Sequence, residues 1–226
     1  MDRCERLLAE IVDEVRWTAS FTGRSELQPR VLDALRTVSR QEFVPADLQL
    51  AAYANQPLPI GEGQTISQPY IVALMTDLLD TKASDVVLEI GTGSGYQAAL
   101  LALLVKKVYS VEIIASLSKD AAARLQRLAY DNIELKVGDG NHGWPEHAPY
   151  DGIIVTAAAP FVPPALLQQL KANGRMIIPI GAPHAAQVLT LITKDAKGEV
   201  MTRNVLDVAF VPLVSGAKNE ASNTLM

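Results

Sequence analysis

The sequence has few of the features that tie a protein to an oxidising compartment, a membrane or a nucleic acid. Its 226 residues include one cysteine, Cys4, so no disulfide can form within the chain, which is typical of a reducing compartment. No apolar run approaches the ~18 residues of a membrane span, and the amphipathic start does not resemble a signal peptide. The net charge of −5 argues against a protein that binds nucleic acid by neutralising many of its phosphates. We therefore expect a cytoplasmic protein with no membrane or nucleic-acid partner.

The sequence also lacks the spacing of a metal site and the residues of a catalytic triad. Its three histidines, His142, His147 and His184, have no metal-ligand spacing with a cysteine or an acid. No serine, histidine and aspartate stand together with independent support. We expect no bound metal, the histidines on the surface or in loops, and Trp17 and Trp144 in packing contacts.

The strongest positive signal is the stretch of residues 86–95. A β-branched apolar run contains Glu89 near its end, and three alternating glycines follow it. Residues 95–105 are then rich in Ala and Leu, which predicts a helix. Strand, glycine turn and helix form the first unit of a nucleotide-binding α/β sheet. The glycines let the backbone approach a ligand, which the first N–H groups of the helix then face.

The glycine spacing leaves several ligands open. The dinucleotide pattern G-x-G-x-x-G is not met, because Tyr96 follows the third glycine. Glu112 ends the next apolar run about 20 residues on, where a ribose-binding carboxylate is expected. Glu89 would sit poorly beside a pyrophosphate and suits a cationic ligand such as S-adenosylmethionine. NAD, FAD and glycines that only pack a helix on a strand remain alternatives.

The rest of the pattern predicts the architecture. Helical spacing of apolar residues marks residues 3–17 and a second helix from Pro29 through Val38, and from residue 85 onward strands and helices alternate. This predicts a three-layer α/β sandwich with a mainly parallel sheet and antiparallel C-terminal strands. We expect an N-terminal helical extension with a substrate loop over residues 1–80, a ligand-binding domain over 81–214 and a flexible tail over 215–226. The expected strands are 85–90, 107–112, 132–137, 151–155, 175–180, 187–193 and 200–211, and the helices after the glycines are 95–105, 115–129 and 163–171.

Residues 53–70 form an unusual loop before the glycine stretch. Their three prolines and two glycines exclude a long regular element, while Leu58 and Ile60 make the loop apolar enough for a lid or substrate wall. A helix is expected over residues 71–79, with Pro69 near its first turn. Ser67 then has two compatible interpretations, as the N-cap of this helix or as a hydroxyl that positions a substrate oxygen.

Polar residues follow four of the predicted strands, where ligands of such sheets bind. They are Glu89, Glu112, Asp139 and Thr156. Asp139 lies in a glycine-flanked turn and either accepts a hydrogen bond from an exocyclic amine such as that of adenine or is an ordinary turn residue. Four polar residues at successive strand ends are a stronger signal than any one of them.

On these residues the chain resembles the protein-L-isoaspartate O-methyltransferase family, from about Thr18 to Leu213. The sequences PLPIG and GQTISQP resemble its hallmark segment, and VLEIGTGSGYQ resembles its cofactor loop. One departure is Asn55, where relatives commonly carry aspartate. If that acid helps to order the loop, the change concerns substrate affinity more than reaction type. The matching segments are residues 57–61, 63–69, 87–97, 138–140, 157–160 and 210–213.

The resemblance implies a Rossmann-like methyltransferase fold and methyl transfer from S-adenosylmethionine to the side-chain carboxylate of L-isoaspartyl residues in age-damaged proteins, which initiates their repair. It also implies that Ser67 is the active-site residue. Separately, we expect a monomer. The substrate site would comprise Thr65, Ile66, Gln68, Pro69, Thr156 and Ala157, and the cofactor site Glu89, Gly91, Thr92, Gly93, Ser94, Gly95, Glu112, Asp139 and Gly140.

Two other functions are weighed against this one. A methyltransferase acting on bases commonly has Asp or Asn, two prolines and an aromatic residue after the fourth strand, whereas residues 155–160 read VTAAAP. A non-catalytic binding protein that kept the fold is disfavoured by the intact glycines and the acids at the strand ends. The absence of an obvious base fits carboxylate methylation, since a carboxylate with a pKa near 3.9 is already ionised at neutral pH.

Overall fold

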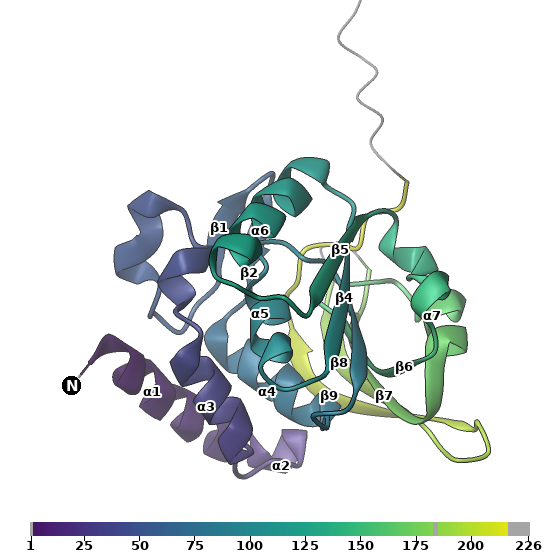
Figure 1. Ribbon diagram of the computed structural model, residues 1–226. Coiled ribbons are helices and arrows are strands. Elements are labelled where there is room, and N and C mark those ends of the chain that lie inside the picture. The colour runs from purple at the N-terminus through teal and green to yellow at the C-terminus, as the bar shows by residue number, and fades with distance from the viewer. Residues whose placement is uncertain (1, 183–184, 217–226) are drawn as a thin grey trace, which may run out of the picture.

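The computed structural model describes residues 2–182 and 185–216, which include a seven-stranded sheet. The strand order is β5–β4–β3–β6–β7–β8–β9 (Figure 1). The first five strands of this order are parallel, β8 is antiparallel to β7, and β9 is antiparallel to β8, as predicted. The bounds are β3 (Val86–Ile90), β4 (Lys107–Glu112), β5 (Ile133–Val137), β6 (Tyr150–Val155), β7 (Leu170–Ile180), β8 (Gln187–Lys194) and β9 (Val200–Val208).

Helices cover both faces of the sheet and give the predicted three layers. The helices α4 (Pro69–Leu79), α5 (Tyr96–Ala102) and α6 (Ala115–Arg127) lie on one face, and α7 (Pro164–Gln169) lies on the other (Figure 1). Alternate residues of a strand point to opposite faces. Accordingly, Val87 belongs to the apolar cluster under α4 and α5, whereas Leu88 belongs to the cluster on the α7 side.

The N-terminal helices add a further layer at one side. They are α1 (Arg3–Trp17), α2 (Ala19–Thr22) and α3 (Pro29–Thr37), and both α1 and α3 pack on α4 (Figure 1). Every residue of α4 is buried, because this helix lies between α1, α3 and the sheet. The short 3₁₀ turns Arg40–Phe43 and Ala46–Ala51 connect this layer to the loop that follows.

The loop predicted before the glycine stretch contains a short hairpin. The strands β1 (Leu58–Gly61) and β2 (Gln64–Ile66) are antiparallel, and the turn between them contains Glu62 and Gly63, both with positive φ. The absence of a long regular element is therefore confirmed. The hairpin itself was not predicted, because Pro59 and the two glycines obscure its period-2 pattern.

Several element boundaries differ from the prediction, and α5, for example, ends at Ala102 rather than at 105. The helix expected over 163–171 ends at Gln169, because buried Leu170 pairs with Tyr150 and begins β7 five residues earlier than expected. The last strand ends at Val208 rather than at 211. Beyond it the chain pairs with the loop after β6, where Ala158 donates its N–H to the Val211 carbonyl.

The aromatic and tail predictions had mixed outcomes. Trp144 is buried as expected, but the packing prediction for Trp17 was wrong, since it is 80% exposed. Trp17 lies one turn after exposed Asp13 on the solvent side of α1. Residues 217–226 of the predicted tail, like His184, lie outside the described residues. No helix within 2–182 and 185–216 has the length and apolarity to span a membrane.

Candidate active site

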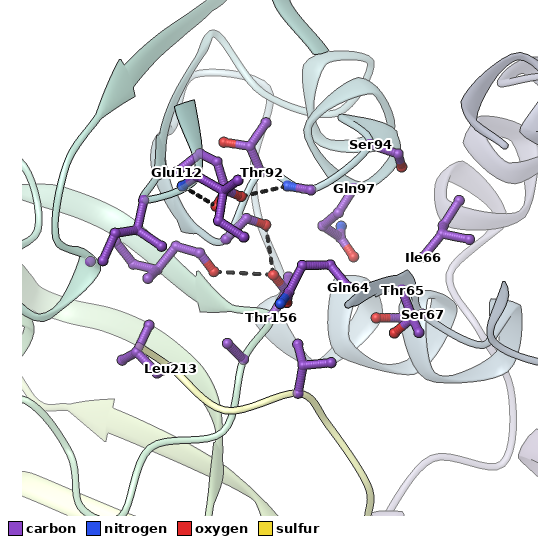
Figure 2. Close-up of a pocket in the computed structure, with 18 of the residues that line it drawn as sticks. Gln64, Thr65, Ile66, Ser67, Thr92, Ser94, Gln97, Glu112, Thr156 and Leu213 are labelled. Carbon is purple, nitrogen blue, oxygen red and sulfur yellow. Dashed lines mark hydrogen bonds between the residues drawn. The ribbon is translucent and has the colours of Figure 1, made fainter. Parts of the chain in front are cut away.

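The strand order reverses at β3, which has β4 on one side and β6 on the other. Ligands of open α/β sheets bind at this point, beyond the carboxyl ends of the strands. A cavity of about 80 Å³, here called the first cavity, lies there (Figure 2). The predicted site residues that line it are Thr65, Ile66, Ser67, Gly91, Thr92, Gly93, Ser94, Glu112, Gly140, Thr156 and Ala157.

A second cavity of about 490 Å³ adjoins the first. Thr65, Ser67, Thr156 and Val211 line both, and Gln68 lines only the second. Ligand sites usually enclose ~300–1,000 Å³. Residues 64–67 line the first cavity together with residues 91–94 of the glycine loop.

The glycine loop combines close approach with helix packing. Gly91 has φ +93°, and a Cβ there would lie 2.5 Å from Thr156 Oγ1, which donates a hydrogen bond to the Gly91 carbonyl at 2.7 Å. Gly95 does not line the cavity, and a Cβ there would meet Leu125 at 3.3 Å. Gly91 thus lets the loop approach Thr156 closely, while Gly95 lets α5 pack closely on α6.

Glu112 is held rigidly at the cavity wall. Its Oε2 accepts the Gly93 N–H at 2.8 Å and its Oε1 accepts the Ile114 N–H at 3.0 Å (Figure 2). The residue is only 5% exposed. Each carboxylate oxygen keeps further acceptor capacity, so the pair of oxygens fits the two hydroxyls of a ribose.

We expect Glu112→Ala to weaken S-adenosylmethionine binding by about 10- to 100-fold, because it removes an acceptor of charge-assisted hydrogen bonds and leaves two buried N–H groups unpaired. Calorimetric titration measures this. Glu134→Ala, which removes an exposed acid of β5, is the control and should leave the Kd unchanged. An unchanged Kd in Glu112→Ala would remove Glu112 from the cofactor site.

Glu89 lies beneath the cavity and does not line it. It is fully buried, its Oε2 accepts the Ser110 hydroxyl, and Ser110 Oγ lies 2.6 Å from Thr92 Oγ1, which does line the cavity. Its Oε1 has no hydrogen-bond partner among the described residues. Burial raises the pKa of Glu89 to about 8, and a cation bound above it would lower that pKa. Glu89 therefore reaches the cavity only indirectly, through Ser110 and Thr92.

The buried Glu89 should also make stability depend on pH. Its pKa is raised in the folded protein, so between about pH 4.5 and 8 the folded state holds a proton that the unfolded state has lost. Its contribution to the free energy of unfolding therefore falls as pH rises through this window. Glutamine at position 89 does not titrate. We therefore expect the free energy of unfolding of Glu89→Gln, minus that of the wild type, to be more positive at pH 8 than at pH 5. Urea unfolding at both pH values measures this difference. A pH-independent difference would contradict this.

Asp139 acts in the structure as a turn residue. Its Oδ1 accepts the Asn141 N–H at 2.9 Å, and its Oδ2 accepts the Gly216 N–H at 3.0 Å. Partial burial opposes ionisation, but the hydrogen bonds from Gly216 and Asn141 outweigh it and lower the pKa of Asp139. Asp139 does not line the cavity, whereas its neighbour Gly140 does. To bind the amine of adenine, one of these two carboxylate oxygens would have to accept a further hydrogen bond.

Ser67 lines both cavities, and Figure 2 shows it beside Thr65 and Ile66 in one of them. The prediction that it caps α4 was wrong, because the N-cap is Gln68 and no side chain caps the helix there. Pro69 takes the first helical position and is buried outside both cavities. Within the described part of the chain, the Ser67 hydroxyl has no hydrogen-bond partner, so it is available to a ligand.

Several lining residues were not predicted. Tyr96 and Gln97 come from the start of α5, Met75 comes from α4, and residues 211–214 close the cavity from the end of the chain. Residues 210–213 were named from the sequence as a segment that matches the family, but no role in the site was assigned to them. In residues 2–182 and 185–216, no cluster of three His, Cys, Asp or Glu side chains could hold a metal ion.

The chain is similar in sequence to known proteins of one family. The family model described as protein-L-isoaspartate(D-aspartate) O-methyltransferase matches residues 21–218. A Syntrophobacter fumaroxidans protein named protein-L-isoaspartate O-methyltransferase 2 is 57% identical over 93% of this chain and 85% of its own length. A Polaromonas protein of the same name is 56% identical over 92% of this chain and 98% of its own.

Solved structures show the same fold. One called protein-L-isoaspartate O-methyltransferase has a TM-score of 0.82 at 28% identity and covers 95% of this chain and 66% of that chain. A Plasmodium falciparum structure, titled a putative member in complex with S-adenosyl-L-homocysteine, has a TM-score of 0.73 at 24% identity over 91% of this chain and 97% of that one. The chain belongs to the protein-L-isoaspartate(D-aspartate) O-methyltransferase family.

Proposed function

We propose that this chain transfers the methyl group of S-adenosylmethionine to the side-chain carboxylate of L-isoaspartyl residues in damaged proteins and peptides, initiating their repair. The observation that carries the proposal is the position of Ser67. It stands across one cavity from the glycine loop and Glu112, and the same residue opens onto the larger second cavity. A cofactor and a peptide can thus meet at Ser67.

We propose that S-adenosylmethionine binds in the first cavity, with contributions from residues that lie beside and beneath it. We propose that Glu89 and residues 91–95 hold its methionine part, Glu112 its ribose and Asp139 its adenine. Glu89 acts from below the cavity, through Ser110 and Thr92. When bound, the cofactor supplies a methyl group on a positively charged sulfur.

The substrate carboxylate needs orientation rather than activation. It is ionised at neutral pH, since its pKa is near 3.9, and its oxygen forms the bond to the methyl carbon as the carbon–sulfur bond breaks. The opposite charges cancel, giving a methyl ester and a neutral thioether. A strong cation on the carboxylate would weaken the nucleophile, whereas the Ser67 hydroxyl and backbone N–H groups of residues 65–68 position it mildly.

The peptide around the isoaspartate would lie in the second cavity. We propose that Thr65, Ile66, Gln68, Pro69, Thr156 and Ala157 form the substrate site. Residues 1–80 would supply its helical wall and hairpin, while 81–214 hold the cofactor. Pro69 would act indirectly, because it starts α4 beneath the site. We further propose a monomer located in the cytoplasm, consistent with the single cysteine.

The experiment that tests this function offers the enzyme several acceptors. Labelled S-adenosylmethionine is incubated with an aged, isoaspartate-containing protein, with the same protein before ageing, and with ribosomal RNA. We expect base-labile label in the aged protein only. Label in RNA would favour a base methyltransferase on this fold. Failure to bind the cofactor in calorimetry would favour a non-catalytic binding protein.

A further inference from the structure

The first helix contributes a carboxylate to the substrate side of the molecule. Glu14 belongs to α1 and lies before residue 21, where the match to the family begins. It is half-buried and lines the second cavity together with Ser67 and Gln68. Because it does not line the first cavity, any role it has concerns the substrate rather than the cofactor.

Glu14 receives hydrogen bonds from both ends of the substrate loop. Asn55 Nδ2 donates to Glu14 Oε2 at 2.6 Å, and Gln68 Nε2 lies 3.4 Å from Oε1 and 3.5 Å from Oε2. Between these two donors the chain forms the β1–β2 hairpin and reaches Ser67. One carboxylate on a rigid helix therefore holds the start and the end of the segment that carries Ser67.

Asn55 is suited to this contact in a way that aspartate is not. Its Oδ1 accepts the Tyr70 N–H at 3.0 Å, one of the unpaired N–H groups at the start of α4. That bond fixes the amide so that its Nδ2 faces Glu14. The side chain at position 55 must accept toward Tyr70 and donate toward Glu14. An amide does both, whereas an ionised carboxylate only accepts.

A second contact lies four residues further along the chain, at Thr18, the C-cap of α1. Thr18 Oγ1 and the Tyr70 hydroxyl are 2.7 Å apart and buried. Burial raises the pKa of Glu14, and the hydrogen bonds from Asn55 and Gln68 oppose that rise. Glu14, Asn55 and Gln68 thus form a half-buried network of charge-assisted hydrogen bonds. Removing one of the three side chains leaves its partners without a hydrogen bond, which costs free energy.

We propose that Glu14 is a positioning residue that places Ser67 for the substrate carboxylate by holding Asn55 and Gln68 in a fixed arrangement. The inference rests on the proposed function, because it assigns Glu14 to the same reaction. It also gives the Asn55 amide a role, because that amide accepts from the Tyr70 N–H and donates to Glu14. In this chain, Glu14 and Asn55 form a matched acceptor and donor.

The test exchanges the hydrogen-bond donor at position 55 and the acceptor at position 14 by mutation. Asn55→Asp sets two carboxylates against each other, and we expect it to raise the KM for an isoaspartyl peptide by about 10-fold and to lower kcat. The double variant Glu14→Gln with Asn55→Asp restores one donor and one acceptor, so it should recover to within about threefold of the wild type. In both, the Kd of S-adenosylmethionine should stay unchanged. Asp13→Asn, on the exposed side of α1, is the control and should match the wild type.

The outcomes separate this inference from the proposed function. Equal KM values for the wild type and Asn55→Asp, or a double variant no better than Asn55→Asp, would overturn the role of Glu14 while leaving the methyltransferase intact. A parallel loss of cofactor binding and of the unfolding midpoint in Asn55→Asp would also overturn it, since that result indicates a general packing role. If the wild type methylates no isoaspartyl peptide, the proposed function itself fails.

Discussion

Replacing Ser67 by alanine is expected to lower kcat/KM for an isoaspartyl peptide by about 10- to 100-fold, the effect of losing one hydrogen bond to a charged group. The Ser67 hydroxyl opens onto both cavities and, within the described residues, has no other partner. Its loss should therefore reduce positioning of the carboxylate without altering the fold. Steady-state kinetics with varied peptide concentration measures the effect.

The control for this variant is the binding of the cofactor. Calorimetry should give the same Kd for S-adenosylmethionine in Ser67→Ala and in the wild type, and the unfolding midpoints should agree. Ser84→Ala, an exposed serine before β3, should leave both kinetics and binding unchanged. Equal losses of activity, cofactor affinity and stability in Ser67→Ala would show that this serine has only a structural role.

Replacing Gly91 by alanine is expected to weaken the binding of S-adenosylmethionine by more than about 10-fold, which corresponds to at least ~1.4 kcal/mol. Gly91 has φ +93°, and the new Cβ would lie 2.5 Å from Thr156 Oγ1. The positive φ alone costs about 1–3 kcal/mol in any other residue. The collision adds to this and displaces the loop that lines the first cavity.

A second glycine separates the cost of the positive φ from the cost of the collision with Thr156. Gly61 has the same φ of +93°, but nothing lies within 4 Å of its added Cβ. Gly61→Ala should therefore show the conformational cost in stability while the Kd of the cofactor stays close to that of the wild type. Adding Thr156→Ala to Gly91→Ala should recover part of the binding. Equal weakening of the cofactor in the Gly61 and Gly91 variants would contradict the close-approach argument.

Sequence reasoning located the parts of the site that follow from sheet geometry. Parallel strands align their carboxyl ends, so Glu112 and Thr156 had to lie beside the glycine loop once the strands were recognised. The glycine spacing and the acid about 20 residues later are local signals of the same kind. The order of the elements was predictable for the same reason, because hydrophobic periodicity carries it.

The remaining features depend on packing that no local pattern encodes. The contact between Glu14 and Asn55 joins residues 41 positions apart and depends on how α1 lies on α4. Glu89 was expected beside the ligand, but its place in the middle of the sheet buries it one layer below. Leu170 could not be assigned to a strand from its sequence, since pairing with Tyr150 determines it.

The most direct test of the function compares two peptides that differ at one residue. One contains L-isoaspartate and the other L-aspartate at the same position, and each is incubated with the enzyme and labelled S-adenosylmethionine. We predict one methyl group on the isoaspartyl peptide, located by mass spectrometry on the side-chain carboxyl, and none on the aspartyl peptide. Equal methylation of both peptides, or of neither while the cofactor still binds, would contradict the assignment.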